Sequence, residues 1–185
     1  MQASALALGL FIAAWSGSST AQPAPSPQPS SGKGAVAKSA AAMPSRSAIE
    51  DVVAEFRSAI TRKDKALFLS LFLDPSRTSW QPVNGDRVVE TKRTTDPSVV
   101  KAKSNPNATP TSFIETVASR SAASDEIFDN IRIGGDADVA TVSLDYRFKL
   151  DGQVKNTGTE HWLLVRTEQG WRITSVNWSI ETYTP

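Results

Sequence analysis

The chain has 185 residues, contains no cysteine and carries a formal net charge of +1. A chain of this length is usually one domain, and the lack of cysteine excludes disulfides, thiolate catalysis and cysteine-ligated zinc. The balanced charge argues against a nucleic-acid partner, whose binding usually shows as a basic patch or stripe.

The N-terminal residues are typical of an export signal. Residues 5–14 form a short apolar run, and the small residues Ser19 and Ala21 suit a cleavage site. About ten apolar residues are too few to span a bilayer but enough for the core of a signal peptide. We therefore predict a signal peptide over residues 1–21, a periplasmic or secreted protein and no membrane span. No Lys or Arg precedes the run, and a disordered Ala-rich tail is the alternative.

Residues 22–44 are rich in Pro, Ser, Ala and Gly, with no acidic residue and almost nothing large and apolar. Such a segment cannot bury enough surface to offset its ordering entropy. We predict a disordered linker here, followed by one folded domain over residues 45–185.

Two helices are predicted at the start of this domain. Ser47 and Glu50 fit a capping box. The apolar residues that follow recur at helical spacing: Ile49, Val52, Val53, Phe56 and Ile60. Asp64 is expected to cap a second helix, which ends before Pro75 because the residue preceding a proline resists helical angles. This helix carries Leu67, Phe68, Leu71 and Phe72.

A short strand and a long loop are predicted next. Residues 78–83 favour a strand, in which Pro82 marks the end or an edge position. Residues 84–107 are polar and rich in turn formers, which predicts a mobile loop or a lid. Its excess of basic residues allows either a solvated loop or a gate for an anionic ligand. Ser112 and Glu115 fit a second capping box, which opens a third helix.

Residues 126–183 read as four antiparallel strands. Asp151-Gly152, between two alternating runs, is a strong hairpin signal that pairs Leu150 with Gln153 and, by counting back, Val142 with His161. Because side chains alternate, one inner face then carries Ala140, Val142, Leu144, Tyr146, Phe148, His161, Leu163 and Val165. Turns near Gly135-Asp136 and at Gln169-Gly170 add Ile127, Asp129, Ile131, Ile133, Thr174, Val176, Trp178 and Ile180.

Three residues on this apolar face suit acid–base chemistry. Asp129 and His161 flank Val142 on neighbouring strands, and Tyr146 lies further along the same face. An acid in apolar surroundings has a raised pKa and His titrates near neutrality, so the trio could transfer protons. The alternative is that Asp129 binds a backbone group and His161 is a core residue with its hydrogen bonds satisfied.

The opposite face is predicted to be polar with an aromatic centre. Glu160, Trp162, Trp171 and Ile173 fall on it in this register. An exposed patch of Trp162 and Trp171 would mark a contact surface, and a homodimer through the sheet face is the natural hypothesis. The alternative is that an end of the chain covers this face.

The order of elements resembles the nuclear transport factor 2-like superfamily, in particular its SnoaL-like branch. Matching stretches are Ile49–Phe72 and Asp138 through Gly170-Trp-Arg-Ile to Ile180. The resemblance implies an α+β fold of the cystatin-like roll type, in which a cone-shaped, curved antiparallel sheet wraps around three N-terminal helices and leaves a pocket at its open end. It also implies frequent dimerisation, and enzymes that use Asp, His and Tyr without metals.

Three functions remain open at this point. The first is binding of a small apolar or amphipathic molecule with no assigned reaction. The second is a cofactor-free isomerase, dehydratase or cyclase, with Asp129 as base, His161 as acid or orienting group and Tyr146 stabilising an enolate-like oxygen. The third is a protein-interaction module of the cell envelope. No metal or cofactor is expected. The residues predicted to line the pocket are Phe56, Trp80, Val142, Leu144, Val176 and Trp178.

Overall fold

The computed structural model describes residues 46–183. The predicted signal peptide at 1–21 and linker at 22–44 lie outside the described residues, and both stay predictions. No helix within residues 46–183 is long and apolar enough to cross a membrane.

Four helices occur among the described residues: α1 (Arg46–Arg62), α2 (Lys65–Ser70), α3 (Asp86–Arg93) and α4 (Pro110–Ser119). The predicted apolar positions of α1 are all buried, and Phe56 is only 1% exposed. The predicted cap of α2 is confirmed, because Asp64 Oδ1 accepts a hydrogen bond from the Leu67 amide at 2.9 Å. α1 begins at Arg46, so Ser47 lies inside the helix and not at its N-cap.

The segment predicted as a loop contains a helix. α3 lies within residues 84–107 and buries only Val88 and Val89, which is too weak a pattern to stand out in a polar sequence. Beyond it, the Asn84 amide donates to the Lys101 carbonyl at 2.7 Å. The chain after α3 is therefore held along the strand that ends at Asn84.

α4 starts earlier than the sequence pattern predicted. Its N-cap is Thr109, which forms a capping box with Ser112, and Pro110 occupies the first turn. The predicted box at Ser112 is wrong by three residues, since Pro110 favours the first helical position and lets the helix begin there.

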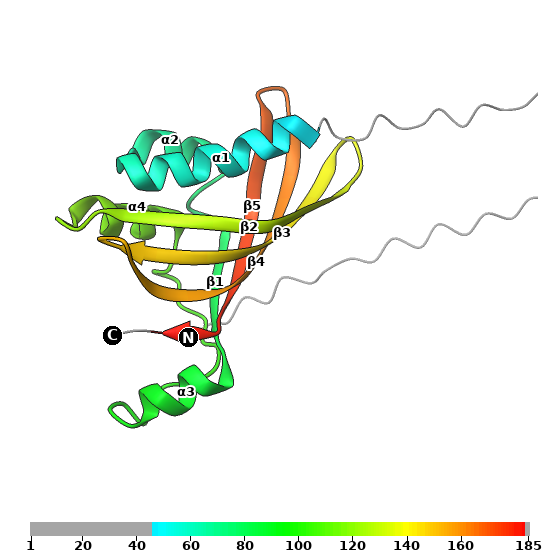
Figure 1. Ribbon diagram of the computed structural model, residues 1–185. Coiled ribbons are helices and arrows are strands. Elements are labelled where there is room, and N and C mark those ends of the chain that lie inside the picture. Colours follow the sequence, from blue (N-terminus) through cyan, green and yellow to red (C-terminus); the bar gives the residue numbers. More distant parts are fainter. Residues whose placement is uncertain (1–45, 184–185) are drawn as a thin grey trace, which may run out of the picture. The chain divides into compact units, whose positions relative to one another are not determined.

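The strands form one curved sheet in the order β1-β5-β4-β3-β2, with β6 paired to β4 (Figure 1). Their bounds are β1 (Ser79–Asn84), β2 (Ser124–Gly135), β3 (Val139–Leu150), β4 (Gln153–Thr167), β5 (Gly170–Ile180) and β6 (Thr182–Tyr183). β1 pairs with β5 in parallel, so the sheet is mixed and not wholly antiparallel. β1 also forms an edge, which explains how the strand tolerates Pro82.

Figure 1 shows α1, α2 and α4 grouped on one side of the sheet, whereas α3 lies apart from them beyond the end of β1. We call the side that α1 covers the inner face. It carries the predicted β3 residues Ala140, Val142, Leu144, Tyr146 and Phe148, all buried.

The predicted register fails on the neighbouring strands because of irregular pairing. Leu150 pairs with Gln153 as predicted, but a bulge between Phe148 and Lys149 shifts β4 by one residue. Val142 therefore pairs with Trp162 and not with His161. A one-residue shift moves every later side chain to the other face. A second shift between Leu163 and Leu164 changes the pairing of β4 with β5.

These shifts reverse part of the predicted outer face. The residues Glu160, Trp162, Trp171 and Ile173 point inward and are buried. Trp162 is 1% exposed and Trp171 is 5% exposed, so they form no surface patch. The homodimer prediction thus loses the surface on which it was based.

Candidate functional site

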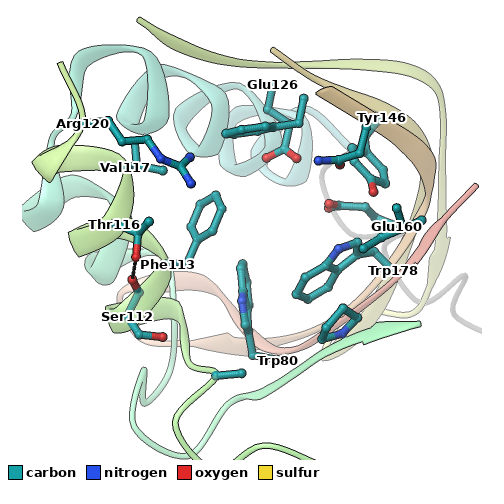
Figure 2. A pocket seen from close by; sticks show the side chains of 15 residues that line it. Trp80, Ser112, Phe113, Thr116, Val117, Arg120, Glu126, Tyr146, Glu160 and Trp178 are labelled. Atoms are coloured by element: carbon teal, nitrogen blue, oxygen red, sulfur yellow. Dashed lines mark hydrogen bonds between the residues drawn. The ribbon is translucent and has the colours of Figure 1, made fainter. Parts of the chain in front are cut away.

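A cavity of about 380 Å³ opens between α4 and the inner face of the sheet (Figure 2). Its lining is mainly apolar and aromatic: Trp80, Pro82, Ala108, Ser112, Phe113, Thr116, Val117, Arg120, Glu126, Tyr146, Phe148, Asn156, Glu160, Trp178 and Ile180. This volume falls in the range of small-molecule sites, roughly 300–1,000 Å³.

Three aromatic rings form one wall of the cavity. Trp80 from β1 stands between Phe113 of α4 and Trp178 of β5, with ring centroids 5.3 Å and 5.1 Å away. Tilted and edge-on contacts at such distances are favourable for aromatic rings. The rings remain partly exposed, so they offer an apolar surface to a bound molecule.

Only part of the predicted pocket lines this cavity. Trp80 and Trp178 do so, as expected. The other four predicted residues, Phe56, Val142, Leu144 and Val176, are at most 1% exposed and belong to the solid core. The prediction was wrong for them because α1 seals that end of the inner face.

Two of the three predicted catalytic residues lie on the outer face. Asp129 pairs with Asp145 across the strands, and its carboxylate binds Arg147 at 2.8 Å. His161 is exposed and pairs with Ser143. The bulge in β4 and the irregular β2–β3 pairing after Asp129 account for both errors. Neither residue lines the cavity.

Tyr146 does line the cavity, as the sequence predicted. Its hydroxyl donates to the Ser179 carbonyl at 3.0 Å. Burial and the nearby Glu160 and Glu126 carboxyls raise the pKa of Tyr146 above its ordinary value, so the phenol keeps its proton. Because that proton already has an acceptor, the Tyr146 hydroxyl can act toward a ligand in the cavity only as a hydrogen-bond acceptor.

Two glutamates that the sequence reasoning did not select face the cavity. Glu126 on β2 is opposite Phe148, and Glu160 on β4 is opposite Leu144, so Tyr146 lies between their levels on β3. The two side chains are 5% and 4% exposed. Figure 2 shows both carboxyl groups directed into the cavity.

Burial raises the pKa of both carboxyl groups. For Glu126 the pKa lies well above the ordinary value, first because of burial and then because of the charges of Glu160 and Asp125. Burial raises the pKa of Glu160 to about 7, and a hydrogen bond from Trp162 partly opposes the rise.

The hydrogen bonds distinguish the two carboxyl groups. Trp162 Nε1 donates to Glu160 Oε2 at 2.7 Å, which favours the charged form of Glu160. Among residues 46–183, the Glu126 carboxyl has no hydrogen-bond partner. Glu126 is therefore the better proton carrier, and Glu160 is the group poised to lose or accept a proton near neutral pH.

A sequence signal for Glu160 existed but was ambiguous. Glu160, Trp162 and Leu164 alternate at period two, but Leu163 and Val165 make the other face of the same strand look equally apolar. Within the described residues, no group of three or more His, Cys, Asp or Glu side chains could hold a metal ion.

Comparison with known proteins shows the fold. No family model matches the chain, and no curated protein matches its sequence. A nuclear transport factor 2-like superfamily protein from Salmonella enterica is similar in structure, with a TM-score of 0.51, 19% identity and coverage of 74% of this chain and 91% of its own.

Two further solved structures are similar. A candidate dehydratase of the NTF2-like family from Streptomyces avermitilis has a TM-score of 0.53 and 15% identity, over 74% of this chain and 95% of its own. A candidate scytalone dehydratase from Novosphingobium aromaticivorans also has a TM-score of 0.53, with 12% identity over 75% and 85% of the two chains. The present chain thus has the α+β fold of the nuclear transport factor 2-like superfamily, which confirms the fold that the resemblance predicted.

Proposed function

We propose that the cavity binds a small, largely apolar molecule and transfers a proton on it, with Glu160 as base and Glu126 as acid. One observation carries this proposal: two buried carboxyl groups with raised pKa face the same apolar cavity. Buried acids tuned toward neutrality are typical of sites for general acid–base catalysis.

The surroundings of each group support its role. Trp162 holds one oxygen of Glu160 and leaves the other, Oε1, available to a ligand. Glu126 keeps its proton because it is buried beside another acid, so it can donate a hydrogen bond to a ligand oxygen. The aromatic wall of Trp80, Phe113 and Trp178 would hold the apolar body of the ligand.

The simplest reaction is proton abstraction next to a carbonyl group. Glu160 takes a proton from the carbon adjacent to the carbonyl. The electron pair of the broken C–H bond forms a carbon–carbon double bond, and the π pair of the carbonyl moves to its oxygen. Glu126 donates its proton to that oxygen, which gives a neutral enol. If a second double bond is conjugated with the enol, Glu160 returns its proton to the far carbon, the enol proton goes back to Glu126, and an isomerisation is complete. If the substrate has a β-hydroxyl, Glu160 gives its proton to that hydroxyl, which leaves as water while the enol proton returns to Glu126, and a dehydration is complete.

Two of the similar structures are candidate dehydratases, which is compatible with this chemistry. A shared fold is not evidence for a shared reaction, so the proposal does not rest on them. A filled cavity and exposed Trp162 and Trp171 would favour the interaction-module hypothesis. In the described domain the cavity is open and both tryptophans are buried, so neither feature favours that function.

The test is hydrogen–deuterium exchange of 2-tetralone, a bicyclic ketone, followed by proton NMR in D₂O at pH 7. Wild-type protein should accelerate exchange at the carbon next to the carbonyl by roughly 100-fold or more over buffer. Glu160→Gln should return the rate close to that of buffer, and Glu126→Gln should lower it less.

Asp129→Asn and His161→Ala are matched controls, because both side chains lie on the outer face. Both should exchange 2-tetralone at the wild-type rate. Binding of 2-tetralone, measured by tryptophan fluorescence, together with exchange at the buffer rate would show a binding site without acid–base activity. Loss of exchange in the controls but not in Glu160→Gln would favour Asp129, His161 and Tyr146 as the catalytic residues instead.

A further inference from the structure

Arg120 places a positive charge on the wall of the cavity opposite the sheet. It follows the last turn of α4, is half-buried and lines the cavity. Figure 2 shows its guanidinium group directed inward from the α4 side, whereas Glu160 and Tyr146 lie on the far side.

This guanidinium group has no partner among the described residues. None of the ion pairs or side-chain hydrogen bonds within residues 46–183 involves it. A cation near the end of a helix often serves the last carbonyl groups. Here the Lys63 ammonium group already donates to the Arg120 carbonyl, so the guanidinium group is not needed for that purpose.

The acids of the cavity do not neutralise it either. No ion pair joins Arg120 to Glu126 or Glu160. An arginine that is partly withdrawn from water and left unpaired favours an anionic partner, and its planar donors match a carboxylate with two parallel hydrogen bonds.

We propose that Arg120 selects ligands with a carboxylate group at one end and an apolar ring system as body. This inference rests on the proposed function for the cavity and for the role of Glu160, whereas the selection of a carboxylate by Arg120 can be tested without catalysis. The carboxylate would bind at the α4 wall, the ring system would lie against Phe113, Trp80 and Trp178, and the reacting carbon would face Glu160. The substrate class is thus an aromatic or alicyclic carboxylic acid.

The test compares two probes of nearly the same shape, the anion 2-naphthylacetate and the neutral 2-naphthylacetamide, by isothermal titration calorimetry at pH 7. Wild-type protein should bind the carboxylate at least about tenfold more tightly than the amide, since hydrogen bonds between charged groups are the strong ones. Arg120→Gln should bind both probes equally, and Arg120→Lys should keep part of the preference.

Arg132→Gln is the matched control, because Arg132 is exposed and its neighbour across the strands is the outer-face residue Ser143. It removes the same charge and should keep the full preference. Binding of the amide by Arg120→Gln shows that the cavity is intact in that variant. Equal affinity of wild-type protein for both probes, no binding of either, or an unchanged preference in Arg120→Gln would overturn the proposal. The neutral ketone 2-tetralone tests Glu160 without any anion, so the two proposals can fail separately.

Discussion

The inner face of the sheet is closed at one end and open at the other. At the closed end, which we define by Phe56, Phe68 and Trp162, the Phe56 ring lies 4.8 Å from Phe68 and 4.7 Å from Trp162. Each of these side chains is at most 1% exposed. At the open end, Phe113 and Trp80 remain partly exposed and border the cavity.

The difference arises from the helices and not from the sheet. β3 supplies buried residues at both ends with the same alternation. α1 packs directly on β2 and fills the closed end, whereas α4 contacts α2 and leaves space over the sheet. An alternating strand therefore predicts a buried face but not whether the space above it holds core or ligand.

Trp162 connects the two ends. Its ring packs against Phe56 in the closed end, and its Nε1 holds Glu160 at the cavity. A base supported by fully buried rings is held in one orientation, which is what a catalytic group requires. The closed end is therefore expected to govern stability, and the open end to govern chemistry.

Phe56→Ala should give the largest effect on stability. Removing a fully buried Phe ring leaves a cavity that the closed end cannot fill, so the free energy of unfolding should fall by about 3–5 kcal/mol. Phe113→Ala at the rim of the open end is the comparison and should lose less than half as much. Urea unfolding of both variants measures the difference, and equal losses would contradict the division into two ends.

Gly158→Ala should destabilise the sheet at the open end. Gly158 pairs with Tyr146, and a Cβ atom on it would lie 1.9 Å from the Ser179 carbonyl oxygen, which accepts the Tyr146 hydrogen bond. β4 and β5 must therefore move apart, which should cost about 1–3 kcal/mol. Gly134→Ala, where the nearest atom is 3.4 Å away, is the control and should change the melting temperature little.

Local signals predicted much of the fold. The face of α1, the cap at Asp64, the Asp151-Gly152 turn and the inner face of β3 are all confirmed. Each depends on spacing within one helix or strand, or on the chemistry of one turn, and such spacing is visible in the sequence. The general fold follows from the order of these elements.

The candidate site could not be predicted in the same way, because it depends on where strands slip. The extra residue in β4, Lys155, lies opposite Phe148 and Lys149, and it turns Glu160 inward and His161 outward. The sequence around Lys155 gives no signal for a bulge. The four residues after His161, Trp162 to Val165, are all apolar. Hydrophobic alternation therefore does not show which of them face inward. On β2, Asn130 adopts a φ of 52°, and the pairing slips just there, after Asp129.

Glu160→Gln should gain stability relative to the wild-type protein as pH rises. The folded pKa of Glu160, about 7, lies above the ordinary value of 4.5, so between these pH values the folded protein binds more protons than the unfolded chain. Wild-type stability therefore falls as pH rises through this range, by roughly 1–3 kcal/mol, and Glu160→Gln lacks this slope. Glu126 adds a slope of the same sign in both proteins.

Urea unfolding at pH 4, 5.5, 7 and 8 measures this difference. The advantage of Glu160→Gln should grow from pH 4.5 to about 7 and then stay constant. Glu168→Gln removes an exposed glutamate from the β4–β5 turn and should follow the wild-type curve. A constant gap between wild type and Glu160→Gln at all four pH values would show that folding does not shift the pKa of Glu160.

Trp162→Phe should give the smallest and most specific effect, because it separates the two duties of Trp162. The phenyl ring keeps most of the contact with Phe56, but the hydrogen bond from Nε1 to Glu160 is lost. That bond favours the charged carboxylate, so its loss should raise the pKa of Glu160 further, by about one unit. The pH at which 2-tetralone exchange reaches half its maximum should then move upward by the same amount.

Phe68→Leu alters the closed end without touching Glu160, and it should lower stability without moving this midpoint. If both variants shift the midpoint equally, packing and not the hydrogen bond tunes the base.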